Sequence, residues 1–280
     1  MTVWREESHG SVIEAANLSP LELKSCCAAV YQSDWARLLL GDSYHPGGPT
    51  LTHRLGELLG LRPGQRVLDV AAGNGPSVLL LAQRFRCQVV GLEFGAAAVA
   101  EAARRAGAAG LAALVEFVQG DGEALPFSDG AFDALVCECS FCTFPDKPTA
   151  AAEFARVLRP GGRLGLADLT RNGDLPPELL GVMAWVACLA DAQPVQSYVA
   201  RFQAAGVAAD RVESHSDALR AMVREVRGRL LGAEVLTKLG KLDLPGVEFD
   251  RVQALARSAA GAVEAGTLGY AVIIGTRQPG

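Results

Sequence analysis

The 280-residue chain has no apolar run long enough to span a bilayer. Its first residues, MTVWREESHG, contain no apolar signal core, and the apolar run SVLLLAQRFRC is interrupted by Arg84 and Arg86. We therefore expect a soluble, cytoplasmic protein that has no membrane partner.

The chain also lacks an excess of positive charge. It has 26 lysine and arginine residues against 31 aspartate and glutamate residues, which gives a formal net charge of −5. Because nucleic-acid-binding proteins need a basic stripe or patch, this balance disfavours a nucleic-acid partner. Half of the residues are hydrophobic, which is enough for one sizeable core.

Histidine is scarce, with four residues, but there are seven cysteines. An odd number of cysteines without an export signal argues against a disulfide scaffold, so thiol chemistry or ordinary packing is the better interpretation. The cysteines are Cys26, Cys27, Cys87, Cys137, Cys139, Cys142 and Cys188.

Between residues 61 and 170, short apolar runs alternate with helical patterns. This alternation predicts an α/β fold with a parallel sheet that helices cover on both faces. The expected strands are 66–72, 88–93, 115–121, 131–139 and 163–169. A helix is expected after Lys147, because Pro148 suits its first turn.

Beyond residue 170 the pattern becomes more helical. Helices are expected over 176–192 and 197–206, and residues 207–216 read as a loop that leads into a strand. Residues 217–262 form a predicted helical insertion before a final strand, LGYAVIIGTRQ. We therefore divide the chain into a helical N-terminal cap, residues 1–60, and a main domain, residues 61–280.

A glycine-rich turn, VLDVAAGNGPS, joins the first strand to the first helix of the main domain. Gly73 and Gly75 lack a Cβ, so the backbone can turn sharply and approach a ligand at the carboxyl edge of the sheet. NAD-binding folds have such a turn too, so it identifies no cofactor alone. Here the third glycine of the dinucleotide motif is missing.

Two acidic residues follow at the ends of the next strands. Glu93 ends the second strand, where a carboxylate can accept hydrogen bonds from ribose hydroxyls, and Asp121, followed by Gly122, ends the third. The segments VLDVAAGNG, VVGLE, QGDGEALPFSDGAFD and RVLRPGGRLGLADL together resemble the class I S-adenosylmethionine (SAM) methyltransferases, in order and spacing.

This resemblance implies a Rossmann-like sheet of seven strands, the last antiparallel, and SAM as cofactor. It places Asp69, Gly73 and Gly75 around the methionine moiety, Glu93 at the ribose, and Asp121 with Gly122 at the adenine. Ala71 stands where the motif usually has glycine, and its methyl group should tighten the turn.

Three cysteines lie where the fourth strand reaches the expected methyl acceptor, in CECSFCTFPDK. Cys137 and Cys139 are two residues apart, so a continuous strand would point both to one face, and Cys142 lies in the loop beyond. Thiolates bind soft centres well. Packing, or a C-x-x-C zinc or redox pair formed by Cys139 and Cys142, remains an alternative.

The stretch is similar to the arsenite methyltransferases, in which a cysteine stands six residues before a Pro-Asp-Lys triplet, as Cys139 does here. Cys188 follows 49 residues later, in a segment that we expect to be helical. The likeness implies that Cys139 and Cys188 bind trivalent arsenic, and that an N-terminal thiol such as Cys27 assists. It also implies a thiol reductant, thioredoxin or glutathione, as partner.

The leading hypothesis is therefore methyl transfer from SAM to a thiol-bound soft acceptor, with arsenite first. One alternative is a methyltransferase for an oxygen, nitrogen or carbon atom of a small molecule, in which the cysteines are packing and Tyr31, Tyr44 or His45 lines the acceptor pocket. Another is a metalloid-binding protein without turnover. The sequence predicts no oligomeric state.

Overall fold

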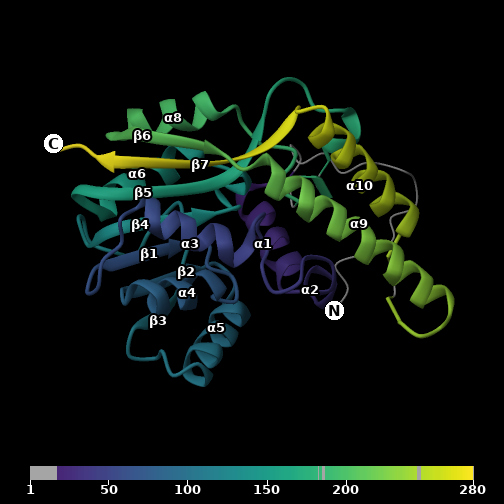
Figure 1. Ribbon diagram of the computed structural model, residues 1–280, viewed down its shortest axis with the longest axis horizontal. Helices are drawn as coiled ribbons and strands as arrows, with labels where there is room; N and C mark the ends of the chain where they lie inside the picture. Colours follow the sequence, from purple (N-terminus) through teal and green to yellow (C-terminus); the bar gives the residue numbers. More distant parts are fainter. Residues whose placement is uncertain (1–17, 182, 185–186, 245–246, 280) are drawn as a thin grey trace.

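A seven-stranded sheet forms the centre of the computed structural model, which describes residues 18–181, 183–184, 187–244 and 247–279. Helices cover both of its faces (Figure 1). The strands are β1 (Arg66–Val70), β2 (Gln88–Glu93), β3 (Val115–Gln119), β4 (Phe132–Glu138), β5 (Leu158–Arg171), β6 (Val207–Ser214) and β7 (Leu268–Arg277).

The strand order is β3-β2-β1-β4-β5-β7-β6. Strands β1 to β5 pair in parallel, whereas β7 is antiparallel to both of its neighbours, β5 and β6. The predicted seven-stranded class I methyltransferase sheet is confirmed. Because the order reverses between β1 and β4, the carboxyl ends of these strands open a crevice of the kind in which α/β proteins bind ligands.

The helices fall into a cap, a set that covers the sheet, and a C-terminal pair. They are α1 (Pro20–Tyr31), α2 (Asp34–Leu40), α3 (Gly48–Leu58), α4 (Pro76–Phe85), α5 (Ala96–Ala108), α6 (Lys147–Val157), α8 (Val195–Ala204), α9 (Ser216–Lys238) and α10 (Phe249–Glu264), with short 3-10 turns η2 (Phe141–Thr143) and η3 (Pro177–Leu179). Residues 1–17 of the predicted cap lie outside the described residues.

Two apolar layers hold the helices against the sheet. Alternate residues along each strand serve one layer or the other: Val67 and Val89 pack towards α3 and α4, whereas Leu68 and Val90 lie in the layer that contains α6 and α8. The sheet is thus buried on both faces, and its polar chemistry is confined to the strand ends.

Two predicted elements differ from the structure. Residues 207–216 are not a loop leading into a strand, since β6 itself occupies most of them; its exposed and charged residues on the sheet edge hid the apolar alternation. The predicted helix over 176–192 is not continuous in the described residues: η3 covers Pro177–Leu179, Met183 and Ala184 are helical, and turns follow at 187–188 and 190–191. The helical insertion is confirmed as α9 and α10.

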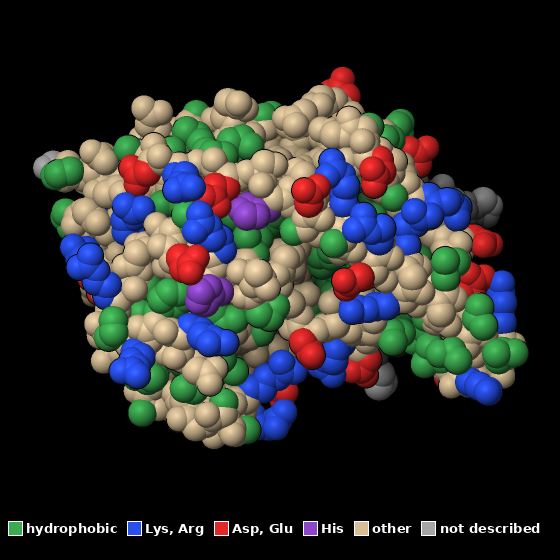
Figure 2. Space-filling model, in the orientation of Figure 1, with side chains coloured by type: hydrophobic (Ala, Val, Ile, Leu, Met, Phe, Trp, Pro, Cys, Tyr) green, Lys and Arg blue, Asp and Glu red, His purple; other side chains and the backbone are tan. Residues whose placement is uncertain are grey.

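Basic and acidic side chains are interspersed over the face shown in Figure 2, so neither sign of charge dominates this face. Three apolar side chains of α9 and the residue that caps it are exposed: Leu231, Val235, Leu236 and Leu239 are 43–63% accessible. None of the helices that the structure describes is long and apolar enough to cross a membrane.

Candidate active site

A single cavity lies at the carboxyl edge of β1, β2 and β4, under the cap. Five of the six residues predicted to hold the cofactor line it: Asp69, Gly73, Glu93, Asp121 and Gly122. Gly75 is the exception. It begins α4 with φ +82°, and a Cβ there would lie 2.6 Å from the ring of Phe117, so its contribution is close packing rather than contact with the cavity.

The glycine-rich turn is shaped by left-handed backbone conformations. Gly73 has φ +54°, and a Cβ there would meet nothing within 4 Å, because it would project into open space. Ala71 has φ +63°, a conformation that side chains disfavour. The tightening of the turn by its methyl group stays a prediction.

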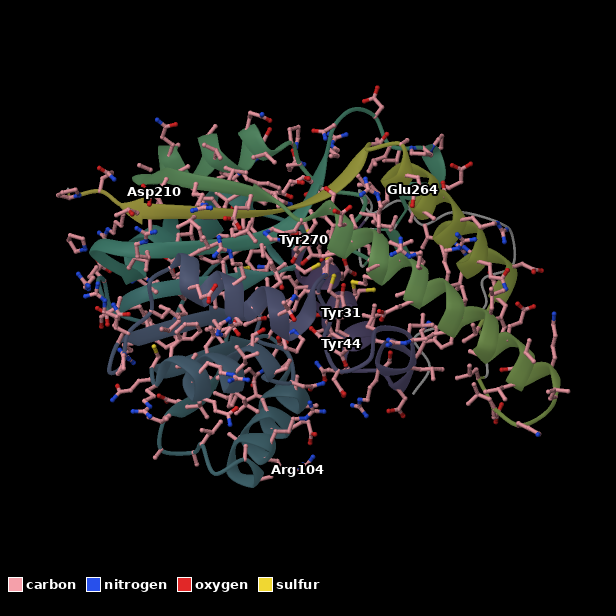
Figure 3. The ribbon with its side chains drawn as sticks, viewed as in Figure 1. Tyr31, Tyr44, Arg104, Asp210, Glu264 and Tyr270 are labelled. Carbon is pink, nitrogen blue, oxygen red and sulfur yellow. The ribbon has the colours of Figure 1, made fainter. Side chains whose placement is uncertain are left out.

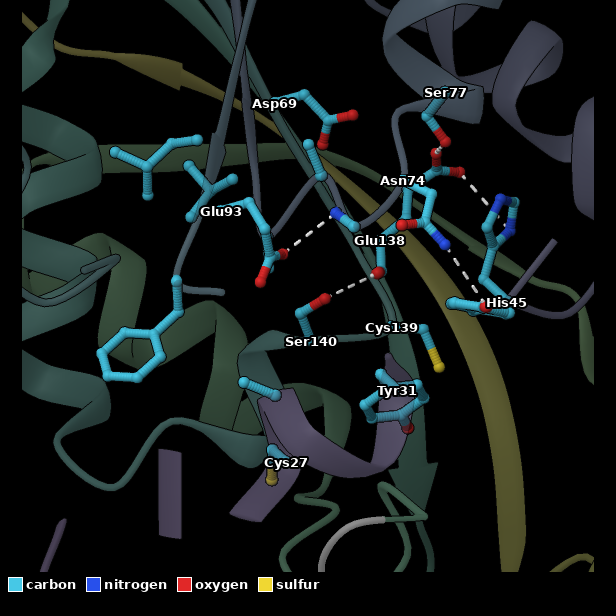
Figure 4. Close-up of a pocket in the computed structure, with 18 of the residues that line it drawn as sticks. Cys27, Tyr31, His45, Asp69, Asn74, Ser77, Glu93, Glu138, Cys139 and Ser140 are labelled. Carbon is cyan, nitrogen blue, oxygen red and sulfur yellow. Dashed lines mark hydrogen bonds and ion pairs between the residues drawn. The ribbon is translucent and has the colours of Figure 1, made fainter. Parts of the chain in front are cut away.

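Glu93 closes the turn from the end of β2. Its Oε2 accepts a hydrogen bond of 3.0 Å from the backbone N–H of Gly73, in the turn that Figure 4 shows beside it, and its Oε1 accepts one of 2.8 Å from the Gly95 N–H. Burial raises the pKa of Glu93, and these N–H groups oppose the rise. The carboxylate is thereby held in place, and each oxygen retains a lone pair for a ligand.

Asp69 is the most deeply buried acidic group of the cavity. Among the described residues its Oδ2 has no hydrogen-bond partner. Burial first, and then the negative charges of Glu138 and Glu93, hold the pKa of Asp69 well above its usual range. A buried carboxylate oxygen without a partner is costly unless a ligand satisfies it.

Asp121 is tied to the cap. Its Oδ2 accepts a hydrogen bond from Lys24 Nζ of α1 at 2.7 Å, and its Oδ1 accepts one from the Glu123 N–H at 2.9 Å. Lys24 also forms an ion pair with Glu123. Lys24 therefore connects the first cap helix, α1, to the acidic loop that follows β3, and we call this pair of contacts the latch.

The cap supplies aromatic and polar walls at the other end of the cavity. Tyr31, Tyr44 and His45 all line it, as one of the alternatives predicts. The rings of Tyr31 and Tyr44 lie 5.8 Å apart, and the Tyr44 hydroxyl accepts a hydrogen bond of 3.5 Å from Asn74 Nδ2. His45 belongs to the segment that joins α2 to α3.

Glu138, the last residue of β4, was missed by the sequence reasoning. Its carboxylate accepts hydrogen bonds from Ser77 Oγ at 2.7 Å and Thr52 Oγ1 at 3.0 Å, and His45 Nδ1 lies 3.7 Å away. An acidic residue directly after the apolar run of residues 134–137 was the available signal.

Three thiols gather beside this cavity. The thiol of Cys188 is hydrogen-bonded to those of Cys139 and Cys142, and its sulfur lies 3.5 Å from the Tyr31 hydroxyl and 3.2 Å from the Cys139 carbonyl oxygen. In Figure 3 the sulfur atoms collect between the labelled Tyr31 and Tyr270. We call Cys139, Cys142 and Cys188 the thiol cluster.

The pKa values of the three thiols in the cluster are shifted in opposite directions. Hydrogen bonds from Cys139 and Cys142 lower the pKa of Cys188 well below the usual thiol range, and Tyr31 and Lys147 contribute further. The same contacts raise the pKa of Cys139, as burial does for Cys142. Cys188 is thus the thiol of the cluster that loses its proton most readily, and while it keeps the proton it donates to the Cys139 carbonyl oxygen.

Both Cys139 and Cys188 have left-handed backbones, with φ +53° and +64°. Cys188 accordingly lies in a turn and not in the predicted helix. The reversal at Cys139 ends the strand, so Cys137 and Cys139 do not share a face: Cys137 packs in the layer of α6 and α8, and Cys139 in the layer of α3 and α4. Positive φ at non-glycine residues costs free energy and is enriched at functional sites.

The other predicted thiol lies close by. Cys27 lines the cavity from α1, and burial, with the charges of Cys188 and Cys26, raises its pKa to about 12. Cys139 also lines the cavity, whereas Cys142 and Cys188 lie behind its wall. In the described part of the chain, no group of three or more histidine, cysteine or acidic side chains is placed to hold a metal ion.

Residues 68–166 match the family model described as "Methyltransferase domain". The chain contains a class I SAM-dependent methyltransferase domain. The fold itself is shared with solved structures: the chain superposes on phosphoethanolamine N-methyltransferase 2 from Haemonchus contortus with a TM-score of 0.74, at 18% identity over 92% of this chain and 60% of the other.

Curated relatives of the methyltransferase domain match over shorter stretches. A demethylmenaquinone methyltransferase from Thermus thermophilus is 46% identical over 101 residues, which are 36% of this chain and 45% of that protein. The O-methyltransferase resE from Aspergillus sclerotiorum is 35% identical over 131 residues, 46% of this chain and 50% of that protein. The chain thus spans about half the length of these relatives.

The cavity of the methyltransferase domain fits SAM on two structural observations. Asp69 presents a buried oxygen without a partner in the described residues, and the space beside Gly73 would be filled by a Cβ. A cation such as the SAM sulfonium or ammonium group would satisfy the buried oxygen of Asp69. The missing Cβ at Gly73 lets a ligand approach the backbone of the turn closely.

Proposed function

We propose that this chain transfers the methyl group of SAM to a small molecule held under the cap. One observation carries the proposal: a single cavity extends from Glu93 and Asp121, at the carboxyl edge of the sheet, to Tyr44, His45 and Cys139. A donor and an acceptor can therefore lie side by side, and such orientation supplies much of the acceleration in a two-substrate reaction.

In this proposal the residues at the sheet edge hold the cofactor. Glu93, oriented by two backbone N–H groups, accepts from the ribose hydroxyls, and Asp121 with Gly122 lies at the adenine. Asp69 faces the positively charged methionine portion. When bound, SAM supplies an electrophilic methyl group on its sulfonium.

An oxygen, nitrogen or carbon atom of a small organic molecule is the acceptor that we favour. The printed names of the relatives point to such acceptors, and Tyr31, Tyr44 and His45 give the cavity aromatic faces and polar atoms that position an organic acceptor. His45 and the Tyr44 hydroxyl are the groups of this wall that can receive a hydrogen bond from the acceptor.

Arsenite is the second candidate acceptor, because Cys139, Cys142 and Cys188 lie together and their hydrogen bonds lower the pKa of Cys188. Thiolates are the ligands that soft trivalent centres prefer. In this reading the cap tyrosines are walls, Cys27 assists from α1, and the predicted thiol reductant restores the cluster.

The test is formation of S-adenosylhomocysteine with SAM and three acceptor sets: phenols, small amines, and arsenite with glutathione or thioredoxin. We expect turnover with an organic acceptor, a loss of about tenfold or more in Tyr44→Phe or His45→Gln, and no comparable loss in Cys188→Ser. Cys87→Ser is the matched control, since Cys87 is a buried thiol in contact with Arg62 and outside the cavity.

The outcomes separate the candidates. Turnover of arsenite alone, abolished by Cys139→Ser and Cys188→Ser but not by Cys87→Ser, would replace the organic acceptor with the soft one. Binding of arsenite without any S-adenosylhomocysteine would indicate the third hypothesis, a binding protein. Failure to bind SAM would refute the methyltransferase proposal as a whole.

A further inference from the structure

Three carboxylates line the inner part of the cavity. Asp69, Glu93 and Glu138 come from the ends of the neighbouring strands β1, β2 and β4, and all three are buried. Figure 4 shows them around the glycine-rich turn, with Glu138 between Asn74, Ser77 and His45. This end of the cavity is therefore strongly acidic.

The basic side chains that line the cavity are largely engaged elsewhere. Lys24 binds Asp121 and Glu123, Arg105 binds Glu101, and Arg37 binds Asp34. His45 is the basic side chain beside Glu138; its Nδ1 also lies 3.2 Å from the Pro46 carbonyl oxygen, and its Nε2 lies 3.2 Å from Thr52 Oγ1.

Glu138 differs from the other two carboxylates in what holds it. Its side chain is only 3% exposed, and its partners are the hydroxyls of Ser77, from α4, and Thr52, from the cap helix α3. Hydroxyl groups satisfy the oxygens without neutralising the charge. Glu138 therefore lies next to the turn with no basic partner among these hydrogen bonds, and its charge helps to raise the pKa of Asp69.

We propose that Glu138 is a specificity-determining residue that makes the cavity prefer a cationic nucleoside, SAM with its sulfonium, over the neutral thioether S-adenosylhomocysteine. The inference rests on the proposed use of this cavity for SAM. Glu93 and Asp121 address the ribose and adenine, which both nucleosides share, so these residues provide no such discrimination. Glu138 favours loading of the donor and release of the spent product.

The experiment measures binding by calorimetry, with no acceptor present. Three ligands are compared at about pH 8, where histidine side chains are commonly uncharged: SAM, sinefungin, which carries an ammonium group near the sulfonium position, and S-adenosylhomocysteine. Glu138→Gln should weaken the binding of SAM and sinefungin about tenfold, because a charge acts strongly at short range in a buried site. It should weaken the binding of S-adenosylhomocysteine less than about threefold, because that ligand has no charge on its sulfur.

Glu93→Gln is the matched control, because it neutralises another buried carboxylate of the same cavity. Glu93→Gln should lower the binding affinity of all three ligands by the same factor. If Glu138→Gln also weakens them equally, or leaves them unchanged, the proposed discrimination is refuted. Should Glu138→Gln unfold, Glu138→Met removes the same charge with an apolar side chain of similar length and is judged by the same ratio.

These outcomes are independent of the acceptor. If the parent protein binds none of the three ligands, the proposed methyltransferase function fails first. If it binds them with a ratio that Glu138→Gln does not alter, only the role of Glu138 is refuted.

Discussion

The two ends of the cavity are built in different ways. The cofactor end is formed by backbone groups and by carboxylates at the ends of strands: Glu93 is held by two N–H groups, and Gly73 leaves open space. At the acceptor end, side chains from distant segments meet: Tyr31 of the cap contacts Cys188, 157 residues away. The cofactor end is thus a local structure, whereas the acceptor end depends on the whole fold.

This difference has a consequence for substitutions. A backbone-built site tolerates changes in neighbouring side chains but not an added Cβ, whereas a side-chain-built site can be altered one residue at a time. The strained backbones at Cys139 and Cys188 belong to the second kind, since the surrounding packing must maintain them. We therefore expect variants of the two ends to be separable.

Gly73→Val should have the largest effect. The added side chain would enter the space beside the turn, so SAM affinity should fall more than about 100-fold, which corresponds to about 2.7 kcal/mol. Calorimetric titration with SAM measures this loss.

Gly60→Val is its control, because Gly60 has a similar φ of +64° and equally open surroundings, but lies outside the cavity. Both variants should lose about 1–2 kcal/mol of stability through backbone strain. Equal SAM affinity in the two variants would show that the turn does not border the cofactor.

Cys188→Ser should remove one thiolate and leave SAM affinity within about twofold. Because the pKa of Cys188 is lowered in the folded state, its thiolate should be present at about pH 7, where ordinary thiols are protonated. Its stabilising contribution is present above the unfolded thiol pKa and is lost as pH falls through the folded value. Ultraviolet absorbance of the thiolate during a pH titration measures it.

Cys87→Ser provides the comparison, since burial raises the pKa of Cys87 to about 11 and this residue contributes no thiolate near neutral pH. If the thiolate signal at about pH 7 survives in Cys188→Ser, or is absent from the parent, the charge assigned to the thiol cluster is wrong.

The same contrast explains what the sequence predicted well. Glu93 and Asp121 sit at strand ends that apolar runs mark clearly, and β2 spans the predicted residues 88–93 without change. Parallel strands bring their carboxyl ends to one edge, so adjacency in space follows from order in the chain. The cofactor end therefore follows from local patterns and sheet topology.

The acceptor end did not follow in that way. The two-residue spacing of Cys137 and Cys139 predicts a shared face only if the strand continues, and the left-handed turn at Cys139 breaks that condition. Glu138 was missed because its partners, Thr52 and Ser77, are 86 and 61 residues away. Contacts of this range depend on how the cap docks, which no local pattern encodes.

Asp168, in β5 behind the thiol cluster, should make stability depend on pH. Burial first, and the charge of Cys188 next, raise its pKa to about 7. Since this value exceeds that of the unfolded chain, the stability associated with Asp168 is fully present below about pH 4 and is lost as pH rises through about 7. The parent should lose about 1 kcal/mol per pH unit across that window through this group.

Asp168→Asn cannot ionise and should abolish this part of the slope. Urea denaturation of both proteins at several pH values tests it, with the shared titrations of other groups cancelling in the difference. Parallel pH dependence of the parent and the variant would mean that Asp168 is already ionised in the folded state over this range.

Lys24→Ala should have the smallest effect, because it alters the latch between the two ends and neither end itself. The Lys24 side chain is 14% exposed and bonds to both Asp121 and Glu123, so its loss leaves two carboxylates facing each other without their cation. Solvent reaches Asp121, which weakens the pair, and we expect a loss of about 1 kcal/mol in urea denaturation.

Lys238→Ala removes an exposed i,i+4 pair with Glu234 on α9 and should cost less than about 0.5 kcal/mol. If Lys24→Ala costs no more than this control and leaves SAM dissociation unchanged, α1 docks through its apolar contacts alone. If SAM dissociates faster from Lys24→Ala, the ion pair helps the cap to retain the cofactor. The two ends of the cavity are then coupled through this one side chain.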